Sequence, residues 1–374
     1  MRGAYNIVTV RGIHIFIHWT FLLLIGWVLL VNFSSGNNIE QLSWSILFIL
    51  AVFACVALHE LGHALMAARF GIKAKNIVLL PIGGTASIEK FPANPRQELA
   101  ISIAGPVVNI VIATLLWLVL LPNTTFTETP KDISIMHGHD FIYNLRIVNI
   151  GLALFNLIPV FPMDGGRILR ALLGFKLNYI QATTIATNAG KIIAVIFVAL
   201  GILLINPFLP IIGIFIIFSA NTEEYYLRLK SLVKGIKLNE VLMYDYNSLQ
   251  ANMTVQEAAN VLNSNHSKYF ILMDGVNPIG SINRLEIVKA IAAMKYNEPL
   301  KKMATEELEF LDGHKYIETV LEKLAHNEER IFPVMDSSHF MGVVNLNHII
   351  EYLLLNKVNT KEYDRIKSLV GLLH

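Results

Sequence analysis

Hydrophobic positions divide the chain into two halves with different patterns. The first half carries apolar runs, each close to the roughly 20 residues that a helix needs to cross a bilayer. We expect six spans, at residues 13–33, 44–69, 97–121, 141–161, 182–205 and 207–227. Residues 228–374 have the mixed pattern and charge density of a water-soluble domain. The pattern therefore predicts an α-helical polytopic membrane protein with an α/β domain after it.

The segment between the second and third spans predicts a β-hairpin. Two β-prone stretches, Asn76–Leu80 and Thr85–Glu89, flank a Pro-Ile-Gly-Gly turn that includes Gly83 and Gly84. Its apolar character favours a re-entrant element that enters the membrane, where protein must cover its backbone. An ordinary cytoplasmic hairpin is the alternative.

Composition agrees with a membrane protein, since 54% of residues are hydrophobic and 16% are charged. The net charge of +2 gives no indication of a nucleic-acid partner, and the single cysteine, Cys55, excludes an intramolecular disulfide. Basic residues gather at the N-terminus, after spans two and four, and after span six. The excess of positive charge predicts that both termini and the C-terminal domain face the cytoplasm.

The second span contains a His-Glu-x-x-His motif, formed by His59, Glu60 and His63. Ionisable groups at membrane depth are costly, ~2.5–3.5 kcal/mol for an Arg, Lys or Asp, which disfavours a chance match. On a helix the two histidines lie one turn apart on one face. That spacing is typical of a zinc site in which the glutamate between the ligands acts as the general base.

A metal held by two histidines needs a further protein ligand, and Asp164 is the best candidate. Prolines precede it and two glycines follow it, which predicts a stiff, locally unwound backbone. The residue types alone equally allow Asp164 to cap the following helix. Asn156, in the apolar fourth span, could join helices by hydrogen bonds or donate to a developing oxyanion.

These motifs resemble the site-2 proteases, which are intramembrane zinc metallopeptidases. The resemblance rests on HELGH in the second span and NLIPVFPMDGGRILR after the fourth, supported by AGPVVN, by the PIGG hairpin and by the opening RGIHIFIHWTFLLL. It covers residues 1 to about 225. It implies that His59, His63 and Asp164 bind one zinc ion and that Glu60 is the catalytic base. It also implies that Asn156 steadies the tetrahedral intermediate.

The second half contains an internal repeat with a constant offset of 62 residues, as in Leu249 and Leu311 or Phe270 and Phe332. Each unit reads as a strand, a helix, two strands and a helix. This pattern resembles a tandem pair of CBS domains, which often dimerise and bind adenine nucleotides. The positions that match the usual ribose-binding aspartate are Glu286 and His348. This departure argues for a dimerising module over a nucleotide-binding one.

The sequence therefore predicts a membrane-embedded metalloprotease core at 1–227, a linker at 228–237, CBS repeats at 238–297 and 298–355, and a tail at 356–374. The expected activity is cleavage of a transmembrane segment of another membrane protein. The resemblance implies as substrate either a membrane-tethered regulator, such as an anti-sigma or transcription factor, or the remnant of a signal peptide. The hairpin, with Gly83 and Gly84, is expected to bind that substrate. The alternative is a transporter regulated by the CBS pair, which would use the intramembrane His, Glu and Asp as an ion path.

Overall fold

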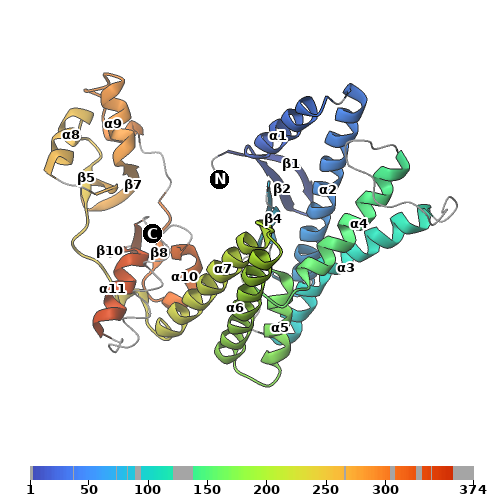
Figure 1. The fold of residues 1–374 in the computed structure, drawn as a ribbon. Helices are drawn as coiled ribbons and strands as arrows, with labels where there is room; N and C mark the ends of the chain where they lie inside the picture. Colours follow the sequence, from blue (N-terminus) through green and yellow to red (C-terminus); the bar gives the residue numbers. More distant parts are fainter. Residues whose placement is uncertain are drawn as a thin grey trace. The chain divides into compact units, whose positions relative to one another are not determined.

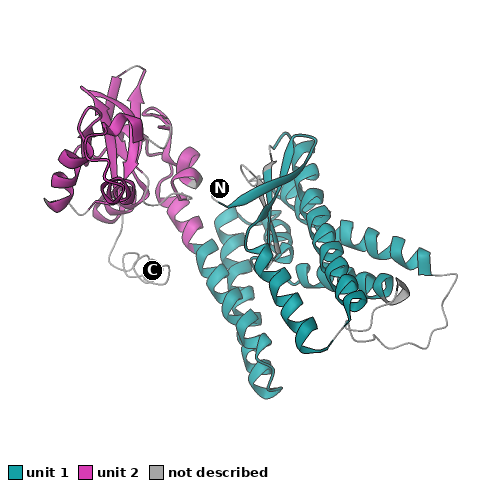
Figure 2. Cartoon of the chain, turned by 90° about the horizontal axis from the view of Figure 1, so that it is seen from above, with its two compact units in different colours: residues 1–224 teal, residues 225–374 magenta. Residues whose placement is uncertain are grey.

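The computed structural model describes residues 3–36, 38–72, 74–81, 83–88, 94–120, 138–264, 267–303, 308–325, 331–337 and 339–356. The chain divides into two compact units, residues 1–224 and 225–374, which Figure 2 colours separately. The predicted tail beyond Asn356 lies outside the described residues.

Unit one contains a four-stranded sheet and the apolar helices (Figure 1). The strands are β1 (Ala4–Val10), β2 (Ile13–His18), β3 (Ala74–Leu80) and β4 (Gly83–Ile88), in that order across the sheet. The helices are α1 (Phe21–Ser34), α2 (Ile39–Arg69), α3 (Pro95–Leu120), α4 (Gly138–Asn156), α5 (Asp164–Gly174), α6 (Tyr179–Leu203) and α7 (Phe208–Leu232). The last of these continues past residue 224 into unit two.

Three of the described helices, α2, α3 and α6, are long and apolar enough to cross a membrane, and α1 and residues 141–156 of α4 are shorter apolar helices. The expected first span was wrong at its start, because Ile13–His18 is a strand and the helix begins at Phe21. Ile13 and Ile15 are buried while His14 between them is exposed, so the segment has the period of two that belongs to a half-buried strand. Reading it as one apolar run concealed that alternation.

The sheet packs on α2, where Ile13, Ile15, Ile77 and Leu79 share a buried cluster with Ala64. The predicted hairpin is present, because β3 and β4 pair antiparallel. Its second strand begins earlier than expected, so Gly83 and Gly84 belong to the strand, and Leu80 pairs with Gly83. β4 is an edge strand, which leaves one side of its backbone without a partner strand among the described residues.

Unit two contains the two predicted repeats. The first comprises β5 (Ser248–Gln250), α8 (Val255–Ser264), β6 (Tyr269–Asp274), β7 (Asn277–Asn283) and α9 (Arg284–Ala292). The second comprises β8 (Leu311–Asp312), α10 (Ile317–Ala325), β9 (Phe332–Asp336), β10 (His339–Val344) and α11 (Leu346–Asn356). Short 3₁₀ helices at Leu238–Glu240 and Leu300–Met303 precede them.

The strand registers reproduce the offset of 62 residues. Leu249 pairs with Leu272 in the first sheet, and Leu311 pairs with Val334 in the second. The opening segments are exchanged between the repeats. Leu238 packs in the core of the second repeat, and Leu300 packs in the core of the first. The two repeats therefore form one folded unit, and a linear cut between them would divide both cores.

Candidate metal centre

Helix α2 places His59 and His63 on one face, and the start of α5 brings Asp164 against both. The His59 and His63 Nε2 atoms are 3.1 Å apart. Asp164 Oδ2 lies 3.2 Å from His59 Nε2 and 3.1 Å from His63 Nε2. All three residues are buried. They form the group that could hold a metal ion among the described histidine, cysteine and acidic residues.

A hydrogen bond on the far side of its ring fixes the tautomer of His63. Its Nδ1 lies 2.7 Å from the backbone carbonyl oxygen of Ile101 on α3. A carbonyl oxygen only accepts, so Nδ1 carries the proton and Nε2 presents a bare lone pair. This is the arrangement in which a histidine binds a metal.

His59 is fixed in the same way through two buried asparagines. Asn149 on α4 donates from Nδ2 to the Leu145 carbonyl oxygen at 2.8 Å, which sets the direction of its amide. Its Oδ1 then accepts from Asn109 Nδ2 on α3 at 3.0 Å. The remaining Asn109 oxygen faces His59 Nδ1 at 2.5 Å and accepts its proton. Both histidines therefore turn bare Nε2 atoms toward the carboxylate.

This donor set fits a divalent metal. Two nitrogen lone pairs and a carboxylate oxygen converge at hydrogen-bond distances of 3.1–3.2 Å without a fixed proton between them. Such acceptors repel each other when buried, unless a cation lies among them. Two imidazoles and one carboxylate are also the ligands of one common class of catalytic zinc site.

Glycines allow the backbone to come this close. Gly105 on α3 lies against the histidines, where an added Cβ would overlap His63 Nε2 and come within 2.7 Å of His59 Nε2. Gly165, next to Asp164, packs against the carbonyl oxygens of Leu157 and Ile158. Any side chain at either position would displace a candidate ligand.

The structure places the other predicted residues as follows. Glu60 is half-buried and lies next to Gly84 of β4, where an added Cβ would be 2.7 Å from Glu60 Cγ. Asn156 is half-buried, and its Nδ2 donates to the Leu152 carbonyl at 2.9 Å, one turn earlier in α4. Asp164 is both a member of the cluster and the first residue of α5, so the two interpretations of it are compatible.

Sequence reasoning missed the roles of Asn109 and Asn149. Both were visible as asparagines within apolar spans, and both are fully buried in the structure. An amide buried in an apolar span is costly unless it is hydrogen-bonded. On that ground the sequence could have indicated that both asparagines are hydrogen-bonded, but it could not have indicated their partners.

Comparisons with known proteins show which family the chain belongs to. The model of peptidase family M50 matches residues 47–204. A zinc metalloprotease of Methanocaldococcus jannaschii is 33% identical over 350 residues, covering 94% of this chain and 96% of that protein. A putative zinc metalloprotease of Synechocystis is 29% identical over 310 residues, covering 78% of this chain and 79% of that protein.

Solved structures are similar to each unit. The site-2 protease from Methanocaldococcus jannaschii has 36% identity and a TM-score of 0.44, covering 59% of this chain and 95% of that one. A CBS domain protein from Pyrobaculum aerophilum has 19% identity and a TM-score of 0.27, covering 32% of this chain and 99% of that one. The strand and helix order of the two repeats identifies the CBS pair independently of such scores. The similarity to the zinc metalloprotease of Methanocaldococcus jannaschii extends over almost the whole chain. The chain therefore belongs to peptidase family M50 and is a zinc metalloendopeptidase of the site-2 protease type.

Proposed function

We propose that this protein cleaves a transmembrane segment of another membrane protein at a zinc ion held by His59, His63 and Asp164. The observation that supports it most is the convergence of two unprotonated Nε2 atoms and one carboxylate oxygen in a buried cluster. A bound zinc ion supplies Lewis-acid activation of water and of the peptide carbonyl. The transporter alternative accounts less well for fixed tautomers, since an ion path needs groups that exchange protons.

Glu60 is the proposed general base. It follows His59 directly on α2, and its partial exposure leaves it accessible to water and substrate. Glu60 accepts a proton from the attacking water and returns it to the leaving amine. Asn156 is the proposed donor to the oxyanion, through the second N–H of the amide nitrogen whose first N–H bonds to the Leu152 carbonyl.

The edge of β4 is the proposed site of substrate presentation. A peptide bond is cleaved only after the substrate helix unwinds, and an unwound segment can pair with an edge strand. β4 is at the edge of the sheet, and its Gly84 contacts Glu60. A strand added there runs past the catalytic base. We expect Gly84→Val to abolish cleavage of a membrane substrate and to leave zinc bound, whereas unchanged cleavage would exclude the β4 edge.

Metal analysis and cleavage by the purified full-length protein test the assignment. We expect one zinc per chain, lost in Asp164→Ala. Glu60→Gln should retain zinc and the fold but lose cleavage, because glutamine cannot accept the proton. Glu40→Gln is a matched control, since Glu40 lies in the first turn of the same helix. Cleavage by the Glu60→Gln protein at the wild-type rate would refute the mechanism.

We further propose that six helices cross the cell membrane, with the hairpin re-entrant and both termini and the CBS pair in the cytoplasm. The basic residues that flank the apolar helices support this orientation. The CBS pair is proposed to dimerise the protein, without bound adenine nucleotide. Chemical cross-linking tests the dimer. Titration of the full-length protein with AMP or ATP tests whether the CBS pair binds a nucleotide. Saturable binding at physiological concentration would overturn the proposal that it binds none.

A further inference from the structure

A buried arginine, Arg170, lies on the helix that begins with Asp164. Its Nε donates to Glu98 Oε1 at 2.7 Å, its NH2 group lies 2.6 Å from the same oxygen, and its NH1 group pairs with Glu223. The central carbon of its guanidinium also lies 5.1 Å from the centre of the Phe161 ring and 5.0 Å from the centre of the Tyr179 ring. Two carboxylates and two aromatic rings therefore fix the position of Arg170.

These contacts connect the aspartate side of the metal centre to the histidine side. Glu98 is on α3, the helix whose Ile101 carbonyl and Asn109 side chain hold the histidines. Phe161 is three residues before Asp164, and Arg170 is six residues after it. Arg170 thus secures the chain on both sides of the aspartate to the helix that orients the other two candidate ligands.

The third partner brings α7 into this arrangement. Glu223 is on α7, and Ile216, two turns earlier, shares a buried cluster with Val160 and Met163 just before Asp164. Glu223 and Ile216 therefore join α7 to the same stretch of chain that Arg170 holds.

We propose that Arg170 is a positioning residue for Asp164, and that α7 holds Arg170 through Glu223. When the ion pair to Glu223 is lost, Arg170 and α5 are placed less firmly, so Asp164 can move relative to the two histidines. The proposal rests on the proposed function, because it requires Asp164 to be a metal ligand.

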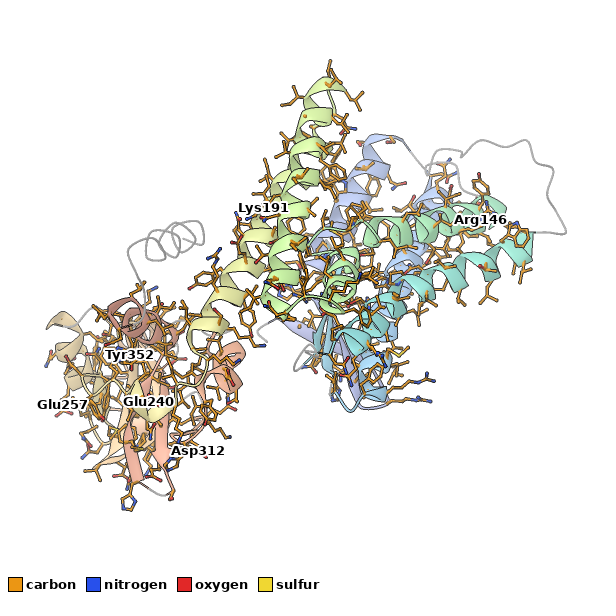
Figure 3. All side chains as sticks on the ribbon, turned by 90° about the horizontal axis from the view of Figure 1, so that it is seen from below. Arg146, Lys191, Glu240, Glu257, Asp312 and Tyr352 are labelled. Atoms are coloured by element: carbon orange, nitrogen blue, oxygen red, sulfur yellow. The ribbon has the colours of Figure 1, made fainter. Side chains whose placement is uncertain are left out.

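Neighbouring glutamates on α7 provide a matched comparison. Glu223 pairs with Arg170 on α5, whereas Glu224 pairs with Lys191 on α6 at 2.8 Å (Figure 3 labels Lys191). Substitution of either by glutamine removes one charge from the same turn of the same helix. The change at Glu223 removes a partner of Arg170, whereas the change at Glu224 removes a partner of Lys191.

The test uses the cobalt form of the full-length protein. The visible spectrum of Co²⁺ reports the geometry of its ligands directly, without any need for turnover. We expect Glu223→Gln to change that spectrum and to weaken metal binding by about tenfold, the lower end of the effect for residues that orient ligands. Glu224→Gln should match the wild type. A wild-type spectrum and affinity in Glu223→Gln, or equal changes in both variants, would overturn the proposal.

The same measurement separates this proposal from the one on which it rests. A wild-type chain that binds no cobalt would overturn the metal centre, and this inference with it. Normal metal binding in the wild type with an unaltered Glu223→Gln spectrum would overturn the inference alone. Arg170→Lys keeps the charge but loses the planar fork, so it should share the Glu223→Gln change even where its thermal stability is normal.

Discussion

The two sides of the metal centre are held by different means. Each histidine has its own hydrogen bond to α3, and that of His59 continues through two buried asparagines to α4. Asp164 reaches the centre through one oxygen, and the chain around it is held by Arg170 several residues away. The histidine side is therefore fixed atom by atom, whereas the aspartate side is fixed through the placement of a whole helix.

This difference indicates where the site can adjust. A direct hydrogen bond to a ring nitrogen sets tautomer and orientation within narrow limits. A helix held by an ion pair at its far side can move as a body when that ion pair changes. Substitutions on the histidine side should therefore remove the metal outright, and those on the aspartate side should modify its geometry.

The largest effect is expected from Gly105→Ala. The added methyl group would overlap His63 Nε2 and approach His59 Nε2, and α3 cannot withdraw without breaking the bond from His63 to the Ile101 carbonyl. We expect metal affinity to fall by more than about 100-fold, which is more than the usual loss when a residue that hydrogen-bonds to a metal ligand is replaced. Gly190→Ala is the control, because its nearest neighbours are 3.6 Å away, an ordinary contact distance. Normal zinc content in Gly105→Ala would contradict the rigid histidine side.

The next effect is expected from Asn156→Ala, which tests chemistry apart from metal binding. Asn156 bonds to its own helix at Leu152 and is not part of the relay to His59. If it donates to the oxyanion, turnover should fall by about 10²–10³-fold with zinc content unchanged. The measurement is the cleavage rate per zinc-loaded molecule. A loss of thermal stability with turnover intact would make Asn156 a packing residue.

Much of the site could be predicted from sequence, because its chemistry lies in residue types that are costly in a membrane. Two histidines and a glutamate in an apolar helix indicate a functional site. Because the histidines are four residues apart on α2, helix geometry predicts that they share one face. The prolines and glycines around Asp164 made it a candidate, but its residue types equally allowed a helix cap, and only the family resemblance favoured a metal ligand. The proximity of Asp164 to the histidines, over a hundred residues earlier in the chain, required the structure.

The remainder depends on contacts between segments that carry no local signal. The first strands were hidden because Ile13 to His18 leads directly into an apolar helix, so two elements read as one run. The exchange of opening segments between the CBS repeats follows from packing of Leu238 and Leu300, which look alike in sequence. Arg170 appeared as one of several basic residues that set the orientation. Only its burial against Glu98 distinguishes it.

The smallest effect, and the most direct test of the hydrogen-bond relay, is expected from Asn149→Leu. Leucine has a similar volume but leaves Asn109 Nδ2 without its acceptor, so the Asn109 amide is free to turn over and His59 loses its fixed tautomer. We expect metal affinity to fall by about tenfold and stability to fall by about 1–3 kcal/mol for the unpaired buried group.

Asn156→Leu, seven residues further along α4, should leave metal affinity unchanged because its amide bonds only within that helix among the hydrogen bonds described. Competition with a chelator, together with thermal unfolding of the metal-free protein, separates the two contributions of Asn149. A stability loss of this size with wild-type metal affinity would show that the His59 tautomer does not depend on Asn149. The histidine side would then be held, like the aspartate side, by the packing of its helices.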